Sequence, residues 1–429
     1  MKVFFDTIGC RLNQAEIEKY AAQFVMLGNE LVPDAESADL VVVNTCSVTA
    51  AAASDSRGKI RNAAKAGAQV VVTGCWSTME PEIAAAMEGV RKVVPNSEKD
   101  QLSAAVLGVE NEIFDEEPLK RIVLPGIHAR TRAFIKIQDG CDNHCTFCVT
   151  HLVRGKSRSI PKERVLRDVL AAISSGGKEV VLTGVNLGAW GLDFEPAEEL
   201  ADLIGFLLQE TDIPRIRLSS LESWNLTDRF LHLWENPRMC AHFHLPLQSG
   251  SDTVLKRMAR RTTLSEFRTL VNKAMAVNPD FAITTDVIAG FPGETDREFD
   301  ETLAFIEGIP FAGGHVFPYS PRPGTPAARM ADQLPKSLQR ERAARLRELF
   351  DRKSDQFQKS FIGSIQKVLW ESSMNKSENQ WESHGLTGIY LTVRVAVPAP
   401  VRNRIDTVRL TAQQDGVLAG EVISSSEKE

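Results

Sequence analysis

The chain of 429 residues contains no run of eighteen or more apolar residues, which argues against a membrane-spanning helix. Its first ten residues lack a basic stretch followed by an apolar core, so we expect no secretory signal. Seven cysteines are an odd number and a low density, which excludes a dense disulfide framework. The expected compartment is therefore the reducing cytoplasm, where free thiols can bind a soft metal.

The chain also lacks a large excess of charge of either sign. The chain has 50 Lys and Arg against 56 Asp and Glu, a formal net charge of −6, which by itself gives no indication of a nucleic-acid partner. Apolar residues make up 43% and charged residues 25%, as in ordinary globular proteins, and no internal repeat or low-complexity tract is present. This length suggests two or three domains.

The first region, 1–115, alternates short β-branched runs with helical stretches. The expected buried strands are 3–5, 40–43 and 70–72, and the expected helices between them are 16–27 and 50–66. This alternation predicts an α/β domain with a parallel, doubly wound sheet. An acidic stretch with a proline, 115–118, is expected to be a linker.

The second region repeats the alternation on a longer period, and we expect a domain over 127–355. Its expected strands are 133–138, 179–183, 215–218, 242–247, 283–288 and 314–317. Helices are expected at 162–174, 196–209 and 264–277, followed by a long charged helix without Gly or Pro at 336–359. Six strand–helix units favour a partial (β/α)6 barrel over the closed eight-stranded form.

The last region, 358–425, changes character, since no helix is evident there. Its expected strands are 365–370, 389–397, 407–411 and 418–423, separated by polar turns. This pattern predicts a small antiparallel β-barrel of the OB-like kind. The tail 424–429 is expected to be disordered.

The strongest local signal is a C-x3-C-x2-C motif formed by Cys141, Cys145 and Cys148. It follows the first expected barrel strand, and this end of a β/α barrel carries the chemistry. Three thiolates cannot complete a structural zinc site, which uses four protein ligands, but they can hold a [4Fe–4S] cluster with one open iron. The alternatives are a zinc knuckle completed by His144 or His151, or thiols without a metal.

Three further cysteines each follow an expected strand of the first sheet. Cys10, Cys46 and Cys75 would project from the carboxyl edge, where open α/β folds bind their ligands. They could hold a second cluster with an open iron, or they could be three separate buried thiols. Cys240 has no neighbouring thiol and is interpreted as structural.

The central motif, with Phe147 just before its third cysteine, resembles the radical S-adenosylmethionine superfamily. That resemblance implies that S-adenosylmethionine chelates the open iron and that Phe147 lies near its adenine. We place further cofactor contacts at the carboxyl ends of three barrel strands. The candidates are Gly184, Asn186, Ser219, Glu222, Gln248 and Ser249, and each has a simpler alternative role as a turn, cap or loop residue.

The resemblance extends along the chain to the methylthiotransferases. The motifs Gly-Cys-Arg-Leu-Asn at 9–13, Asn-Thr-Cys at 44–46 and Thr-Gly-Cys at 73–75 resemble the family's N-terminal domain. Arg-Gly-Lys-Ser-Arg-Ser at 154–159, Leu-Pro-Leu-Gln-Ser-Gly-Ser-Asp at 245–252 and Arg-Pro-Gly-Thr at 322–325 resemble its core. The last region corresponds to the family's RNA-binding TRAM domain. Arg11 after the first cysteine favours the branch that modifies N6-threonylcarbamoyladenosine at position 37 of tRNA.

This resemblance implies a transferase with two [4Fe–4S] clusters, held by the six cysteines above, and S-adenosylmethionine. The central cluster would pass an electron to S-adenosylmethionine, giving a 5′-deoxyadenosyl radical that abstracts hydrogen from C2, while the second cluster carries the sulfur. No catalytic side chain is assigned beyond the cluster ligands. An electron donor such as flavodoxin or ferredoxin is implied as a partner.

Local basic clusters count for more in RNA binding than the net charge does. Basic side chains follow the central cysteine motif and the loop at 248–250, and a third group lies on the helix after Cys46. The candidate RNA-binding residues are Arg154, Lys156, Arg158, Arg257, Arg260 and Arg261. A tRNA anticodon loop is the expected partner, because its unpaired bases can be splayed into a pocket. The alternative for each cluster is a solvated helix face.

Two other functions stay open on the sequence. One is a methylthiotransferase that acts on isopentenyladenosine-37 or on a ribosomal-protein aspartate. The other belongs to a different class, a non-enzymatic RNA-binding protein with a structural zinc ion.

Overall fold

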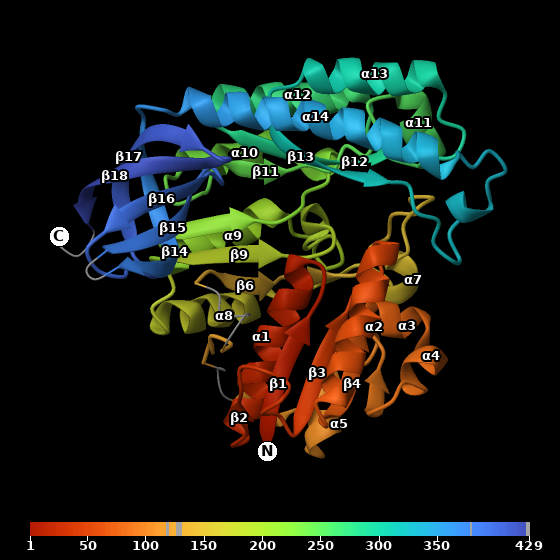
Figure 1. The fold of residues 1–429 in the computed structure, drawn as a ribbon, viewed down its shortest axis with the longest axis vertical. Helices are drawn as coiled ribbons and strands as arrows, with labels where there is room; N and C mark the ends of the chain where they lie inside the picture. Colours follow the sequence, from red (N-terminus) through yellow and green to blue (C-terminus); the bar gives the residue numbers. More distant parts are fainter. Residues whose placement is uncertain (117–119, 126–130, 378–379, 426–429) are drawn as a thin grey trace. The chain divides into compact units, whose positions relative to one another are not determined.

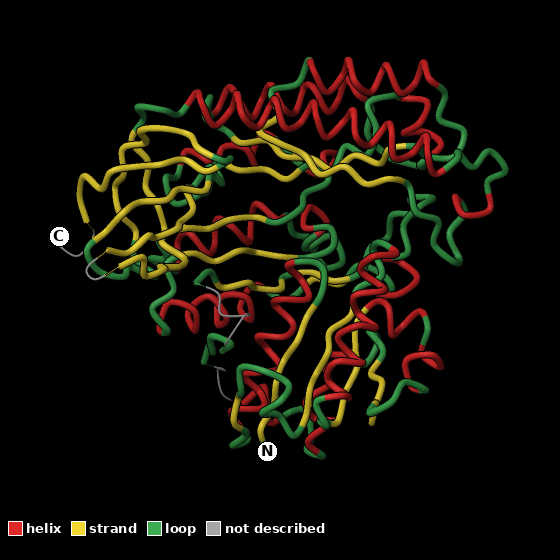
Figure 2. The backbone as a smooth tube through the Cα atoms, in the orientation of Figure 1, coloured by secondary structure: helices red, strands yellow, loops and turns green. Residues whose placement is uncertain are grey.

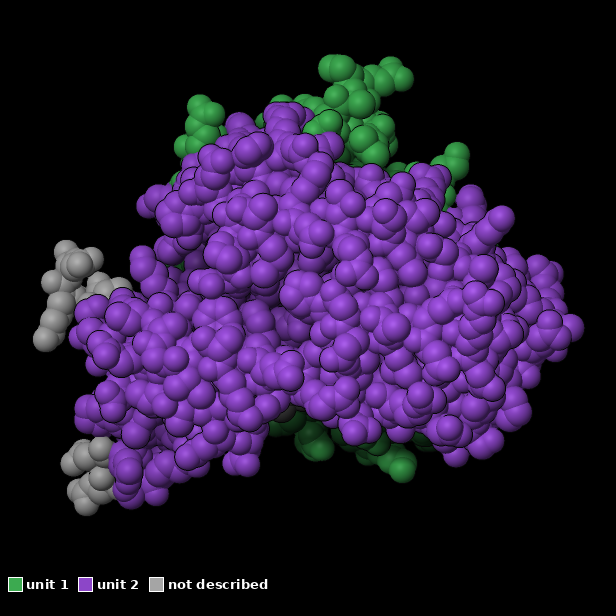
Figure 3. Space-filling view, turned by 90° about the horizontal axis from the view of Figure 1, so that it is seen from above, with its two compact units in different colours: residues 1–143, 148–199, 209–211 green, residues 144–147, 200–208, 212–429 purple. Residues whose placement is uncertain are grey.

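The computed structural model describes residues 1–116, 120–125, 131–377 and 380–425. These form two compact units, coloured separately in Figure 3. The first unit contains Met1–Asn143, Cys148–Glu199 and Gln209–Thr211, and the second contains His144–Phe147, Leu200–Leu208 and Asp212–Glu429. Within the described residues, no helix combines the length and the apolar character needed to cross a bilayer.

The N-terminal sheet is parallel throughout, as predicted. Its strands are β1 (Lys2–Thr7), β2 (Glu30–Leu31), β3 (Leu40–Thr45), β4 (Gln69–Gly74) and β5 (Val90–Val94), in the order β2-β1-β3-β4-β5. The three strands expected from the sequence are β1, β3 and β4, the neighbours at the centre of the sheet. Their β-branched side chains are buried on both faces, which is typical of a parallel sheet covered by helices.

Alternate side chains of the central strands enter two separate cores. Val3 and Phe5 pack with α1 and α5, whereas Phe4 packs on the opposite face with α2. Because successive side chains of a strand point to opposite faces, this alternation makes the sheet doubly wound. The helices of this part are α1 (Arg11–Met26), α2 (Ala50–Lys65), α3 (Cys75–Met79), α4 (Pro81–Ala85), α5 (Leu102–Leu107) and α6 (Ile113–Glu116).

Helix α6 occupies the beginning of the stretch that we expected to be a linker. The remainder of that stretch, 117–118, lies outside the described residues. The domain boundaries 1–115, 127–355 and 358–425 stay predictions.

All six expected barrel strands are present. The first unit contains β6 (Ala133–Lys136) and β9 (Glu179–Thr183), which pair in parallel, with β7 (Gln138–Asp139), α7 (Thr150–Arg154), β8 (Arg158–Ser159) and α8 (Lys162–Ser174) between them. The second unit contains β10 (Arg215–Leu218), β11 (His242–His244), β12 (Ala282–Ala289) and β13 (Phe311–Pro318). Strands β11, β12 and β13 form a parallel sheet in that order.

Helices cover one face of the β11–β12–β13 sheet, as Figure 1 shows. They are α12 (Leu264–Val277), α13 (Asp296–Glu307) and α14 (Lys336–Ser360), while α10 (Asp228–Leu231) and α11 (Asp252–Arg257) are short and α9 (Leu200–Glu210) precedes β10. The long helix α14 packs against β12 and β13. Gly314 of β13 permits this approach, since a Cβ there would lie 2.5 Å from the Phe350 ring.

The C-terminal strands close into a five-stranded barrel, visible at one end of the chain trace in Figure 2. They are β14 (Ile365–Ser377), β15 (Gln380–Thr387), β16 (Thr392–Val397), β17 (Ile405–Gln414) and β18 (Val417–Ser425). The sequence predicted an antiparallel barrel, but β16 and β18 pair in parallel. An odd number of strands cannot alternate in direction all the way round a closed barrel, so one parallel pair is required. The end of the predicted disordered tail, 426–429, lies outside the described residues.

Two arginines of β10 bind backbone carbonyls of the C-terminal barrel. Arg215 donates to the carbonyl oxygens of Leu386 (2.9 Å) and Lys367 (2.5 Å). Arg217 is fully buried and donates to those of Thr387 (2.9 Å) and Gly388 (3.1 Å). Its guanidinium also lies 5.0 Å from the Tyr390 ring centroid. Guanidinium hydrogen bonds to buried carbonyls therefore attach this barrel to the core of the second unit.

Candidate functional site

Three cysteines of the first unit follow three neighbouring parallel strands. Cys10 comes after β1, at the residue just before α1, Cys46 comes directly after β3, and Cys75 is the first residue of α3 after β4. The carboxyl ends of parallel strands meet at one edge of a sheet, so the predicted convergence of these positions is confirmed. All seven cysteines of the chain lie in its described parts, and none of them is in a disulfide bond.

The three thiols also interact electrostatically, as the pKa of Cys46 shows. Burial is the main cause that raises the pKa of Cys46, to about 12, and the nearby Cys10 and Cys75 raise it further. In the apoprotein Cys46 is therefore a neutral thiol at neutral pH. A cationic metal centre would reverse this preference, because thiolate is the form that binds metal. The donor set of three adjacent soft ligands fits an iron–sulfur centre.

Two glycines, Gly9 and Gly74, allow the segments that follow neighbouring strands to pack against one another. Gly9 has φ +101°, and a Cβ there would lie 2.6 Å from Cys46 Sγ. Gly74 has φ +99°, and a Cβ there would lie 2.3 Å from the carbonyl oxygen of Thr45. Both positions need a residue without a side chain, for the backbone angle and for the space.

Gly9→Ala is expected to empty the strand-end site while the chain stays folded. The positive φ costs roughly 1–2 kcal/mol for alanine, and the added methyl would displace Cys46. Gly67→Ala is the matched control, because Gly67 has φ +86° with nothing within 4 Å of a Cβ. Iron analysis should show about eight irons per chain falling by about half in Gly9→Ala alone. Equal iron in both variants would contradict this prediction.

Arg154, the last residue of α7, lies against this group of cysteines. Its Nε donates to Cys75 Sγ at 3.3 Å, and its Nη2 donates to Asn13 Oδ1 at 2.8 Å. The same Asn13 oxygen accepts from Cys10 Sγ at 3.6 Å. Nη1 donates to Glu16 Oε1 (3.0 Å) and Asp139 Oδ1 (2.9 Å). The guanidinium therefore connects two of the three cysteines with two buried carboxylates.

Two lysines complete a buried charge network around Glu16 and Asp139. Lys99 pairs with Glu16 and lies 2.8 Å from Asp139 Oδ2, and Lys136 lies 2.9 Å from the same oxygen. Burial alone would raise the pKa of both carboxyls, but Arg154 and the two lysines hold the pKa of Glu16 and of Asp139 well below their ordinary values. Both acids are thus ionised at neutral pH. Sequence reasoning did not find this network, because its members are far apart in the chain.

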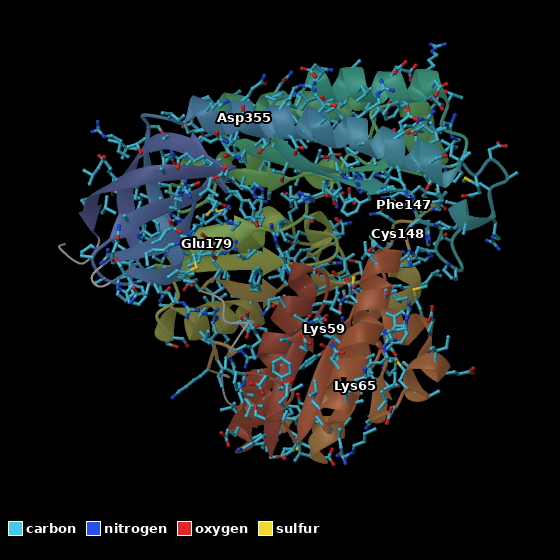
Figure 4. All side chains as sticks on the ribbon, in the orientation of Figure 1. Lys59, Lys65, Phe147, Cys148, Glu179 and Asp355 are labelled. Atoms are coloured by element: carbon cyan, nitrogen blue, oxygen red, sulfur yellow. The ribbon has the colours of Figure 1, made fainter. Side chains whose placement is uncertain are left out.

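The C-x3-C-x2-C loop is tied locally to the segment that follows α7. Cys141 N donates to the Gly155 carbonyl at 3.0 Å, and Gly140 has φ +73° with a virtual Cβ only 1.9 Å from the Lys156 carbonyl oxygen. Cys148 Sγ accepts from Thr150 N at 3.4 Å. Figure 4 labels Phe147 and Cys148 next to each other on this loop. Among the described residues, no group of three His, Cys, Asp or Glu side chains is arranged to hold a single metal ion.

The predicted cofactor contacts of the first unit follow β9. The backbone nitrogens of Val185 and Asn186 both donate to Gln138 Oε1 at 3.0 Å. Gly184 has no room for a side chain, since a Cβ would lie 2.9 Å from that same oxygen. In the described structure, Asn186 Oδ1 is buried without a hydrogen-bond partner. A buried acceptor of this kind suits a donor from a bound molecule.

Four of the predicted contacts lie on the strand ends of the second unit. Ser219 Oγ, just after β10, is buried without a partner among the described residues. Glu222 forms a two-point ion pair with Arg260 at 2.9 and 2.6 Å. Gln248 has φ +73°, and Ser249 is fully buried with its hydroxyl 3.3 Å from Thr302 Oγ1. Ser249 therefore supports the loop, and S-adenosylmethionine contact at these positions stays a prediction.

Phe147, the remaining predicted cofactor contact, packs on an apolar cluster of the second unit. This cluster includes Met258, Phe291 and Tyr319. Its neighbour Thr146 donates its Oγ1 hydrogen to the Arg257 carbonyl at 3.0 Å. The aromatic ring is therefore held in place by the segment around α11.

The predicted RNA-binding arginines and lysine differ in exposure. Lys156, Arg158 and Arg261 are exposed. Arg257 is half-buried and pairs with both oxygens of Glu298. The predictions for Arg154 and Arg260 are corrected, because both side chains are buried and their charges are paired with carboxylates. A buried, paired guanidinium is not available to a phosphate backbone.

Two family profiles match this chain. The Radical SAM superfamily matches residues 135–306, and the uncharacterized protein family UPF0004 matches residues 2–95. The first contains the C-x3-C-x2-C loop, and the second contains the three strand-end cysteines.

Curated relatives cover nearly the whole chain. The threonylcarbamoyladenosine tRNA methylthiotransferase MtaB of Thermotoga maritima is 38% identical over 379 residues, 86% of each chain. The MtaB of Bacillus subtilis is 36% identical over 405 residues, 91% of this chain and 89% of its own. The tRNA-2-methylthio-N(6)-dimethylallyladenosine synthase of Oceanobacillus iheyensis is 32% identical, covering 87% and 75%.

A solved structure supports the fold. It is the radical S-adenosylmethionine methyltransferase TsrM of Kitasatospora setae, with a TM-score of 0.57 and 14% identity over 76% of this chain and 77% of its own. At this identity the similarity speaks for the arrangement of strands and helices alone.

Proposed function

Because the chain belongs to the radical S-adenosylmethionine methylthiotransferase family, we propose that it transfers a methylthio group to C2 of N6-threonylcarbamoyladenosine at position 37 of tRNA. The similarity to the MtaB proteins over most of the chain carries this proposal. The residues around the first cysteine, with Arg11 after it, support the same substrate.

We assign the metal ligands to the two cysteine sets. Cys10, Cys46 and Cys75 would hold one [4Fe–4S] cluster, and Cys141, Cys145 and Cys148 the other. The adjacency of Cys10, Cys46 and Cys75 at one sheet edge supports the first set. The spacing of Cys141, Cys145 and Cys148 within eight residues supports the second. When bound, the two clusters and S-adenosylmethionine supply the one-electron chemistry, the carbon-centred radical and the sulfur.

The chain's own side chains then have binding and positioning work. Asn186 Oδ1 and Ser219 Oγ are buried polar atoms at strand ends that lack protein partners in the described structure, so they suit the polar groups of S-adenosylmethionine. Phe147 offers an aromatic face to the adenine.

The tRNA is bound, in this proposal, by the exposed basic residues Lys156, Arg158 and Arg261 together with the C-terminal barrel acting as a TRAM-like domain. The anticodon loop is the element bound, because position 37 lies in it. We further propose that the protein works in the cytoplasm and receives electrons from a flavodoxin or ferredoxin.

The dimethylallyladenosine synthases are the second candidate, since one is 32% identical over most of this chain. Family membership decides against a non-enzymatic zinc protein. Iron and sulfide analysis after anaerobic purification gives an independent check, with about eight irons and no zinc expected per chain.

Deletion of the gene is expected to remove 2-methylthio-N6-threonylcarbamoyladenosine from tRNA and leave the unmodified N6-threonylcarbamoyladenosine. Mass spectrometry of digested tRNA nucleosides measures both, and the methylthiolated isopentenyladenosine level serves as the internal control. An unchanged level of the threonylcarbamoyl product rules out the proposed substrate. Loss of the isopentenyl product instead would favour the second candidate.

A further inference from the structure

The side chain of Arg154, which follows the central cysteine loop, forms a hydrogen bond with one of the strand-end cysteines. It lies six positions after Cys148, and its Nε donates to Cys75 Sγ at 3.3 Å. It also reaches Cys10 through the shared acceptor Asn13. A thiol sulfur is a weak acceptor, whereas a thiolate bound to metal is a much better one for a cationic donor.

The buried network around Arg154 contains more positive than negative groups. The two acids, Glu16 and Asp139, are already matched by two lysines, Lys99 and Lys136. Asp100 also approaches Lys136, at 3.4 Å, but its side chain is 58% exposed and its charge is screened by water. Three cations, Arg154, Lys99 and Lys136, therefore face two buried carboxylates, so the network carries a net positive charge, and the Arg154 side chain is only 3% exposed.

A buried surplus charge is costly unless an anion compensates it. A guanidinium stays protonated in proteins, and Arg154 lies 3.0 Å from Glu16 Oε1 and 2.9 Å from Asp139 Oδ1, so its positive charge persists on burial. A [4Fe–4S]²⁺ core with three thiolate ligands carries one net negative charge, which would balance the net positive charge of this network.

We propose that Arg154 is a positioning residue of the strand-end cluster, holding a buried positive charge against Cys75 that offsets the negative charge of the cluster. This inference rests on the proposed function, because it requires a cluster at the Cys10, Cys46 and Cys75 site. It gives the Arg-Gly-Lys segment a role distinct from phosphate binding.

The test is the midpoint reduction potential of this cluster alone. A full-length chain with Cys141→Ala, Cys145→Ala and Cys148→Ala is reconstituted with iron and sulfide, so that only the strand-end site can be filled. A positive charge stabilises the reduced, more negative cluster by Coulomb attraction. Arg154→Gln is therefore expected to lower the potential, Arg154→Lys to restore part of it, and Asp139→Asn to raise it.

Arg158→Gln is the matched control, because Arg158 is an exposed arginine four positions away. Its potential should equal that of the parent. Opposite shifts in Arg154→Gln and Asp139→Asn support the inference, since loss of packing would not change sign with charge. Equal potentials in Arg154→Gln and Arg158→Gln, or shifts of the same sign in the two network variants, overturn it.

Two further results distinguish a folding defect, or a failure of the proposed function, from a failure of this inference. If Arg154→Gln loses its cluster or fails to fold, Asp139→Asn and Arg154→Lys decide, and an unchanged potential in Asp139→Asn overturns the inference. If the parent with three alanines binds no iron at all, the assignment of the strand-end cluster fails, and with it the proposed function. If it binds about four irons and only the potentials fail to move, the role of Arg154 alone is wrong.

Discussion

Cys148→Ala is expected to abolish reductive cleavage of S-adenosylmethionine. The proposed central cluster has only three protein thiolates, and its fourth iron must stay open for the substrate, so no spare ligand can replace Cys148. Cleavage is measured as methionine and 5′-deoxyadenosine formed under a strong reductant, and both should fall to the level without enzyme. About four irons should remain at the strand-end site.

Cys240→Ala is the control for this change, because Cys240 is a buried cysteine outside both sets. It should keep full iron content and full cleavage. The assignment of the central cluster would be wrong if Cys148→Ala cleaved S-adenosylmethionine at a rate close to that of Cys240→Ala.

Cys46→Ala is expected to separate the two half-reactions. It removes one of three thiols at the strand-end site and leaves the central loop untouched, so cleavage of S-adenosylmethionine should continue. Methylthio transfer to a tRNA anticodon stem-loop should be lost, because the proposed sulfur carrier is missing. Iron should fall from about eight to about four per chain.

Both half-reactions can be measured in one sample. Nucleoside mass spectrometry measures methylthio transfer, and 5′-deoxyadenosine measures cleavage of S-adenosylmethionine. Cys240→Ala again serves as the control. Normal transfer by Cys46→Ala would refute the second cluster, and loss of cleavage as well would show that the two sites cannot be separated in this way.

Hydrophobic patterning predicted most of the fold. The runs that became β1, β3, β4 and β9 are continuous and apolar, with valines in β3, β4 and β9 and Val-Phe-Phe in β1, and buried parallel strands are recognised by such runs. The strand β15, with the sequence QWESHGLT, was missed because it has no regular apolar alternation. Its place is fixed by backbone pairing with β14 and β16 in the closed barrel.

The cysteines could be predicted because each follows a recognisable strand, so topology alone brings them to one edge. The charge network could not, because Glu16 and Arg154 are separated by 138 positions and neither sits in a pattern that indicates burial of a charge. Proximity to the cysteine motif suggested that Arg154 binds RNA, whereas its neighbours in space are Cys75 and two carboxylates. Pairing of charges across a fold depends on tertiary contacts that sequence spacing does not contain.

The contact between Arg154 and Cys75 also affects the order in which the parts of this site are completed during synthesis of the chain. Domains fold as they leave the ribosome, N-terminal parts first, and the three strand-end cysteines are available once β4 has paired. The guanidinium follows 79 residues after Cys75. A nascent chain that has folded only its first sheet thus presents the thiols without the Arg154 guanidinium, and the charge environment of the proposed cluster site is complete only after the central cysteine loop and α7 have been synthesised. Both proposed cluster sites therefore depend on synthesis of the same short segment, 141–154.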